Sequence, residues 1–276
     1  MDSLFTFKNS MIFTNLVVFM DYGSMLDQTF AYTKEGVWGR TKRWLILIGC
    51  LILFPLILGY MVRIFRGVKP APEPEQWGSM FIDGLKLLVV EVVYIIPVIL
   101  LVIIAFLPLL STLIAGGAPH KDPSSLSDAQ IQQWILVHPE FISAIGFLAI
   151  LLLLAVLCGI IISIFSFLGV VRFARTGSMA EAFNFSAIVS HIRRIGWLNY
   201  LLALIVISVI GFIFGMVTNV FSLIPIFGDL IGVIVMIILY VPYFIFTSRY
   251  VSLVYDIGEE KSDPEPIMYN TIITTQ

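Results

Sequence analysis

The chain has 276 residues, of which 59% are hydrophobic and 12% are charged, and its formal net charge is −2. An average soluble domain has about 25% charged residues, so this composition excludes a soluble globular domain and predicts a membrane protein. No basic face of useful size lies outside the predicted membrane flanks, so we expect no nucleic-acid partner. Cys50 and Cys158 both lie in apolar runs and are typical of small buried hydrophobic residues, not of a disulfide or a metal site.

The start of the chain differs from the rest. Residues 1–19 contain a short apolar run after Lys8, but this run lacks the small-residue cleavage site of a signal peptide. We expect residues 1–19 to be an N-terminal extension, residues 20–255 to form a single integral membrane domain, and residues 256–276 to form a polar cytoplasmic tail.

Four apolar segments are long enough to cross a bilayer, for which about 20 helical residues suffice. They cover residues 87–110, 141–171, 197–219 and 229–248. Asp229 follows Pro225 at the break between the last two segments. We interpret Asp229 as a helix N-cap that satisfies free backbone N–H groups, with an outward cation ligand as the alternative. The chain is therefore predicted to be an all-α, polytopic helical membrane protein with four full crossings.

Arginines flank these crossings on one side of the membrane. Arg172 and Arg175 follow the second crossing, Arg193 and Arg194 precede the third, and Arg249 ends the fourth. The positive-inside rule places all of them in the cytoplasm. We therefore predict a multi-pass protein of the cell membrane whose N- and C-termini are both cytoplasmic.

A fifth apolar segment, residues 44–62, has Pro55 near its middle and basic residues beyond both ends. A single kinked crossing would place one basic cluster outside, against the positive-inside rule. A re-entrant hairpin broken at Pro55, which has no backbone N–H to donate, keeps both clusters inside. The charge pattern favours the proline-broken hairpin and leaves the kinked crossing open.

Two further stretches, residues 22–35 and 182–196, have apolar residues at helical spacing. The predicted apolar faces are Tyr22, Met25, Leu26 and Phe30 in the first stretch and Phe185, Ile188, Val189, Ile192 and Ile195 in the second. His191 falls on the polar face of the second stretch. We expect amphipathic interfacial helices, and the pattern alone does not say whether lipid or protein covers their apolar faces.

Two kinds of side chain are candidates for function. Arginines at the ends of apolar blocks could bind lipid phosphate groups, although topology determination is the simpler interpretation. These candidate headgroup contacts are Arg63, Arg66, Arg172, Arg175, Arg193, Arg194 and Arg249. Apart from Asp229 at the start of the last segment, Glu91 is the only acid within a predicted crossing, and it is a candidate intramembrane polar site. The favoured alternative is a helix that begins late, so that Glu91 snorkels to the interface near Lys86.

No catalytic or cofactor-binding motif is present, so we name no catalytic residue and no cofactor. The loop between the first two crossings holds polar residues without the spacing of metal ligands, namely His120, Asp122, Asp128, His138 and Glu140. Gly211 with Gly215, and Gly228 with Gly232, have the spacing that lets helices pack closely. These pairs could pack within the chain or join two copies.

A weak internal repeat relates distant parts of the chain. Residues 63–67 (Arg-Ile-Phe-Arg-Gly) resemble residues 172–177 (Arg-Phe-Ala-Arg-Thr-Gly), and the Pro55 segment resembles the Pro225 segment. Repeated copies of one unit, with a surface helix, an apolar hairpin and a basic exit, would explain both resemblances. Apolar sequences also resemble one another by chance, so this interpretation is not specific.

Several short motifs together resemble a known family. They are Met20-Asp21-Tyr22-Gly23, Gly59-Tyr60-Met61-Val62-Arg63, Trp77-Gly78 and Phe81-Ile82-Asp83-Gly84-Leu85-Lys86. The chain resembles, over roughly residues 20–255, a prokaryotic and mostly archaeal membrane family known as domain of unknown function 4013. The resemblance implies an integral membrane protein and supplies no activity, ligand or catalytic residue.

The most favoured function is a non-enzymatic protein that organises or scaffolds the membrane, with the lipid bilayer as its partner. Re-entrant hairpins and interfacial helices would load one leaflet more than the other. A small-solute transporter or channel is the first alternative and would depend on Glu91. A lipid-modifying enzyme is the last alternative, because no acid, base or metal cluster is visible.

Overall fold

The computed structural model describes residues 20–112, 114, 127–137, 139–224 and 227–260. Across these ranges the chain is helical and contains no strand, which confirms the all-α prediction. Four helices are long and apolar enough to cross a membrane, namely α5 (Trp77–Thr112), α7 (Pro139–Thr176), α10 (Trp197–Asn219) and α11 (Gly228–Glu260). Each contains one of the four predicted crossings, so the chain is a multi-pass membrane protein.

The chain divides into two compact units. One unit contains residues 42–190, and the other contains residues 1–41 and 191–276. Helix α9 (Phe185–Ile195) begins in the first unit and ends in the second. The single domain predicted over residues 20–255 stays a prediction, and each unit is described by itself.

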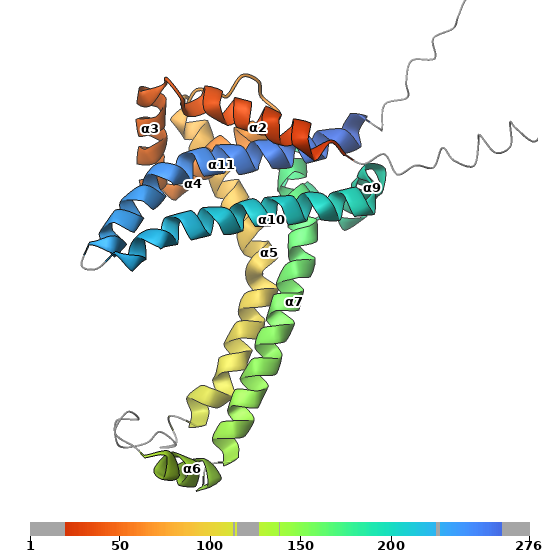
Figure 1. Cartoon of the computed structure of the whole chain (residues 1–276). Helices are drawn as coiled ribbons and strands as arrows, with labels where there is room; N and C mark the ends of the chain where they lie inside the picture. The colour runs from red at the N-terminus through yellow and green to blue at the C-terminus, as the bar shows by residue number, and fades with distance from the viewer. Residues whose placement is uncertain (1–19, 113, 115–126, 138, 225–226, 261–276) are drawn as a thin grey trace, which may run out of the picture. The chain divides into compact units, whose positions relative to one another are not determined.

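In the unit of residues 42–190, α5 and α7 run side by side (Figure 1). The short helix α6 (Asp128–Val137) packs against α7. Helix α5 begins at Trp77, ten residues before the predicted start at residue 87. Met80, Gly84 and Leu87 are buried at helical spacing, which extends the helix through the polar residues that precede the apolar run. The expectation of a helix that begins near Glu91 is therefore wrong.

The predicted break in the 44–62 segment separates two short helices, α3 (Thr41–Ile52) and α4 (Phe54–Phe65). Leu53 leaves the helical conformation, with φ −101° and ψ 77°. Pro55 follows in the first turn of α4, where the missing N–H is not needed for a helical hydrogen bond. The break therefore follows from the backbone chemistry of proline.

The chain reverses direction between the two short helices, and we call this element the α3–α4 hairpin. Arg43, near the start of α3, donates from Nε to the Glu73 carboxylate at 3.0 Å. Arg63, near the end of α4, donates to the backbone carbonyl of the same Glu73 at 3.2 Å. Because the outer ends of both helices meet at Glu73, the chain folds back at Leu53. A re-entrant position of this hairpin in the membrane stays a prediction.

Helix α4 packs on α5 at very close range, and two glycines make this possible. A Cβ at Gly59 would collide with the backbone carbonyl of Met80, and a Cβ at Gly84 would collide with the backbone carbonyl of Pro55. Each helix therefore presents a glycine to the backbone of the other. The contact anchors the hairpin to the start of α5.

In the other unit, α2 (Tyr22–Val37) packs along α11. The buried face of α2 differs from the prediction, because Phe30 is 64% exposed while Thr29 and Thr33 are buried. Both threonine hydroxyls donate to carbonyls one turn earlier, at 2.7 and 2.9 Å. Their polarity is satisfied within the helix, so they can be buried where hydrophobicity alone places polar residues outside.

Helix α11 is longer than the predicted crossing and runs through Glu260. The first five residues of the predicted tail are therefore helical, and Arg249 lies inside the helix instead of at its end. The helix begins at Gly228, so Asp229 lies in its first turn and does not precede it. Pro225 and the rest of the predicted tail lie outside the described residues, as do residues 1–19.

Candidate functional site

The candidate site of the first unit is a group of charged side chains, the arginine cluster, where α4 and α7 end. Its members are Arg43, Arg63, Arg66, Arg172 and Arg175, with Glu73, Asp83 and Glu181. These residues come from α3, α4, α5, α7 and the short helix α8 (Met179–Ala182), which contains Glu181. Glu73 lies in the loop before α5. The cluster contains four of the seven predicted arginines.

Two arginines of the cluster exchange equivalent hydrogen bonds. Nε of Arg66 donates to the carbonyl of Ala174 at 3.3 Å, and Nε of Arg175 donates to the carbonyl of Phe65 at 2.6 Å. Each arginine therefore binds the residue that precedes the other. The last carbonyls of a helix lack partners within it, so each arginine satisfies the end of the opposite helix.

A glycine with positive φ follows each of these arginines. Gly67 (φ 81°) ends α4, and Gly177 (φ 74°) ends α7. Left-handed glycines commonly stop helices in this way. The guanidinium of Arg175 also lies against Gly67, where a Cβ would be 2.9 Å from a terminal nitrogen. The two related sequence segments thus have the same local structure and contact each other.

Both arginines of the segment at residues 63–67 bind other residues of the same unit. Arg63 donates to the carbonyls of Glu73 and Gln76 and to the Ser79 hydroxyl, at 3.2–3.4 Å. Arg66 additionally pairs with the Asp83 carboxylate at 2.8 Å. Asp83 belongs to the Phe-Ile-Asp-Gly-Leu-Lys run of the family motif. These bonds tie the loop before α5 and the first two turns of α5 to the end of α4.

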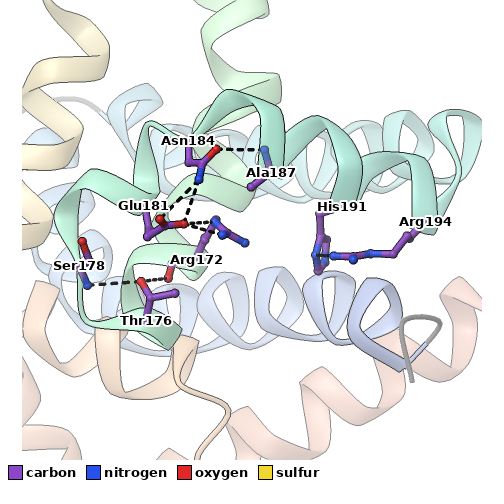
Figure 2. Close-up of polar contacts among 8 residues, drawn as sticks. All are labelled: Arg172, Thr176, Ser178, Glu181, Asn184, Ala187, His191 and Arg194. Carbon is purple, nitrogen blue, oxygen red and sulfur yellow. Dashed lines mark hydrogen bonds and ion pairs between the residues drawn. The ribbon is translucent and has the colours of Figure 1, made fainter. Parts of the chain in front are cut away.

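Figure 2 shows the corresponding contacts after α7. Nε of Arg172 donates to the Glu181 carboxylate at 2.7 Å, and the Asn184 amide donates to the same carboxylate at 3.3–3.4 Å. The hydrogen bonds from Arg172 and then from Asn184 lower the pKa of Glu181 below its ordinary value. The side-chain oxygen Oδ1 of Asn184 accepts a hydrogen bond from the backbone N–H of Ala187 at 3.1 Å. Asn184 therefore caps the start of α9.

The other three predicted arginines lie in the second unit. Arg193 and Arg194 are exposed near the end of α9, and Arg194 contacts the His191 ring at 2.9 Å. Arg249 is only 2% exposed, and its guanidinium lies 5.1 Å from the centre of the Tyr32 ring, a cation–π contact. Headgroup binding by the seven arginines stays a prediction.

His191 is a polar residue whose environment the sequence did not predict. Its ring is 1% exposed, stacks on the Tyr255 ring at 4.0 Å, and contacts the Tyr255 carbonyl at 2.9 Å. Gly258 leaves room for the ring, since a Cβ there would collide with it. The placement of His191 on the polar face of α9 is therefore wrong. A glycine three residues after a tyrosine is too common a signal to have indicated this pocket.

Glu91 lines a groove between α5 and α7. The groove has a volume of about 350 Å³. Its lining residues are Glu91, Val92, Tyr94, Ile95, Val98, Gly159, Ile162, Ser163 and Ser166. Tyr94 donates its hydroxyl hydrogen to the carbonyl of Ala182 in α8, so this end of the groove lies near the polar end of the α5–α7 pair. Glu91 makes no hydrogen bond or ion pair with the described members of the arginine cluster.

Other predicted positions give a mixed result. Cys50 is buried and Cys158 is half-buried. Among the described residues no group of three histidine, cysteine or acidic side chains could hold a metal ion. His120, Asp122 and His138 lie outside the described residues.

The helices and their polar ends define a multi-pass α-helical membrane protein. The chain belongs to the family described as protein of unknown function (DUF4013), whose model matches residues 44–223. This match confirms the family resemblance, and it covers the α5–α7 groove and the arginine cluster except Arg43. The Met20–Gly23 motif lies before the matched residues. No curated protein and no solved structure matches the chain.

Proposed function

We propose that this protein organises the membrane without catalysing a reaction, and that its α3–α4 hairpin acts as a wedge in the cytoplasmic leaflet. The observation that carries the proposal is the tip of the hairpin. Three consecutive apolar residues there, Ile52, Leu53 and Phe54, are 87%, 57% and 46% exposed. Such a cluster is unfavourable in water and favourable in lipid.

The dimensions of the hairpin suit one leaflet. Each of its helices has 12 residues and is about 18 Å long, which is shorter than the hydrocarbon core of about 30 Å. The basic residues Lys42 and Lys69 are exposed near its two outer ends, where they can meet anionic lipid headgroups. The hairpin therefore has an apolar tip and positively charged residues at its two outer ends, which is the pattern expected of a re-entrant element.

The amphipathic helices contribute less to this role than the sequence suggested. Ile188, Ile192 and Ile195 of α9 are buried within the protein, and α2 buries one face against α11. Their apolar faces are thus largely covered by protein. Changes such as Ile188→Asp would disturb folding, so they cannot test membrane remodelling.

The test is vesicle remodelling by the full chain reconstituted at high density. We expect the parent protein to reduce vesicle diameter or form tubules, as seen by cryo-electron microscopy. A triple variant, Ile52→Ser with Leu53→Ser and Phe54→Ser, should lose this effect, because it removes about 2 kcal/mol of apolar burial per side chain. The matched control exchanges the same residues for other apolar ones, Ile52→Leu, Leu53→Ile and Phe54→Leu. Unchanged vesicles with the parent protein, or full remodelling by the serine variant, would contradict the proposal.

We further propose that the protein lies in the cell membrane with both termini in the cytoplasm, because the positive-inside rule assigns the helix ends that carry basic residues to the cytoplasmic side. Copies could associate through Gly215, where a Cβ would meet nothing within 4 Å. The neighbouring glycines are used within the chain, since Gly211 faces the Tyr243 hydroxyl and Gly232 faces the Thr218 carbonyl.

A small-solute transporter is the second candidate, because Glu91 lines a groove within a spanning helix pair. Glu91→Gln should then abolish solute flux in proteoliposomes, and wild-type flux in that variant would remove the candidate. The lipid-modifying enzyme is the last candidate, and no group of side chains that could hold a metal ion supports it in the described ranges.

A further inference from the structure

The groove between α5 and α7 has a polar end and an apolar end. A Cβ at Gly159 would lie 3.9 Å from Cγ2 of Val98, so these two residues face each other. From this contact, seven residues back along α5 lead to Glu91, and seven residues forward along α7 lead to Ser166. Both steps cover about 10 Å in the same direction, because the helices are antiparallel. Glu91 and Ser166 therefore lie at one end of the groove, and Val98 and Gly159 lie at the other.

The polar end offers acceptors and no cation. Glu91 makes no hydrogen bond or ion pair with another described residue, and none of the residues that line the groove is positively charged. The Ser163 hydroxyl donates to the carbonyl of Ile160 at 2.7 Å, so its free lone pairs accept. A carboxylate beside hydroxyl oxygens is the chemistry that recognises a cation with several N–H donors.

The apolar end excludes a simple ion as the natural occupant. Ile95, Val98, Gly159 and Ile162 present only hydrocarbon and a glycine to the groove. Gly159 keeps this end open, since its missing side chain leaves only Val98 in contact distance. A ligand that fills the groove therefore needs an apolar chain below its charged group.

We propose that the groove binds one amphiphile with an ammonium headgroup. The ammonium lies at Glu91 and Ser166, and the first part of the apolar chain lies along Val98 and Gly159. The volume of about 350 Å³ is at the lower end of the range of small-molecule sites and fits a headgroup with part of one chain. The charge of Glu91 and the apolar lower end together select this class of ligand. The site is independent of the hairpin wedge.

The test is native mass spectrometry of the full chain released from detergent, with phosphatidylethanolamine and phosphatidylglycerol offered at equal concentration. We expect one phosphatidylethanolamine per chain to bind about tenfold more tightly than phosphatidylglycerol, as one charge-assisted hydrogen-bonded contact provides. Glu91→Gln should abolish this preference. Glu35→Gln, the same change on the exposed face of α2, should preserve it.

Two further arms separate the parts of the proposal. Free ethanolamine, which has the ammonium without the chain, should not compete at concentrations where the lipid is bound. Gly159→Leu should reduce lipid binding by filling the apolar end, with a melting temperature close to that of the parent to show that the fold is intact. Equal binding of the two lipids, an unchanged preference in Glu91→Gln, or full competition by ethanolamine would overturn the proposal.

Discussion

Arg66 and Arg175 each donate a hydrogen bond to the backbone carbonyl of the residue that precedes the other. The exchange joins the ends of α4 and α7, which are more than 100 residues apart in the sequence. It also relates the two segments that resemble each other, since both end a helix and both are followed by a left-handed glycine. The hairpin is thereby fixed to the spanning helices at its base.

Loss of either arginine should weaken the first unit. Hydrogen bonds to charged groups contribute about 1.5–3 kcal/mol each, so Arg66→Ala and Arg175→Ala should each lower the free energy of unfolding by about this amount. We expect the double variant to lose less than the sum, because both changes break the same junction. Denaturant unfolding in detergent measures the free energy of unfolding of the parent, the two single variants and the double variant. Arg193→Ala, at an exposed position of α9, is the control, and strictly additive losses would contradict the exchange.

The two left-handed glycines provide a matched pair. Alanine at either position meets a left-handed strain of about 1 kcal/mol. Gly67→Ala also displaces the Arg175 guanidinium, because the new Cβ would lie 2.9 Å from it. Gly177→Ala displaces nothing, because no atom lies within 4 Å of a Cβ at that position. Gly67→Ala should therefore lower the melting temperature more than Gly177→Ala. Equal shifts would show that the Arg175 contact contributes nothing.

The crossing of α4 and α5 should be intolerant of any side chain. Gly84→Ala places a methyl group against the carbonyl of Pro55 and should cost about 1–3 kcal/mol or more as the helices separate. Gly78→Ala, in the same helix but with nothing within 4 Å, should be neutral or stabilise the protein by up to about 1 kcal/mol. Thermal unfolding of the two variants gives the comparison. A destabilised Gly78→Ala with an unaffected Gly84→Ala would disprove the close crossing.

Acid should weaken the contact between α7 and α8. The pKa of Glu181 lies below its ordinary value of 4.5, because Arg172 and Asn184 donate to the carboxylate. Its contribution to stability is therefore fully present above that ordinary value and is lost as the pH falls through the lowered pKa. Glu181→Gln should remove this part of the pH dependence and leave stability near neutral pH slightly reduced. An identical acid profile for parent and variant would contradict the assignment.

The four spanning helices and the break near Pro55 could be predicted because bilayer thickness and proline chemistry act directly on the sequence. The long apolar runs indicated the spanning helices, and Pro55 within residues 44–62 indicated the break between α3 and α4. The resemblance of the two arginine segments was also visible. Their mutual contact was not, because the acceptors are backbone carbonyls and these leave no signal in the sequence.

The errors in the predicted faces of α2 and α9 share one physical cause. The predicted faces of α2 and α9 assumed that polar side chains lie outside, yet Thr29, Thr33 and His191 are buried. The threonines bond to their own helix, and His191 bonds to Tyr255. Burying a polar group costs little free energy when the group keeps a hydrogen-bond partner, so a hydrophobic pattern cannot identify such residues.

Side-specific cysteine labelling tests the re-entrant hairpin most directly. In a variant without the native Cys50 and Cys158, we predict that an impermeant maleimide labels Lys42→Cys and Lys69→Cys from the cytoplasmic side. Ser111→Cys, exposed near the far end of α5, should label only from the opposite side. Labelling of Lys42→Cys and Lys69→Cys from opposite sides would mean that residues 44–62 cross the membrane once, and would contradict the wedge.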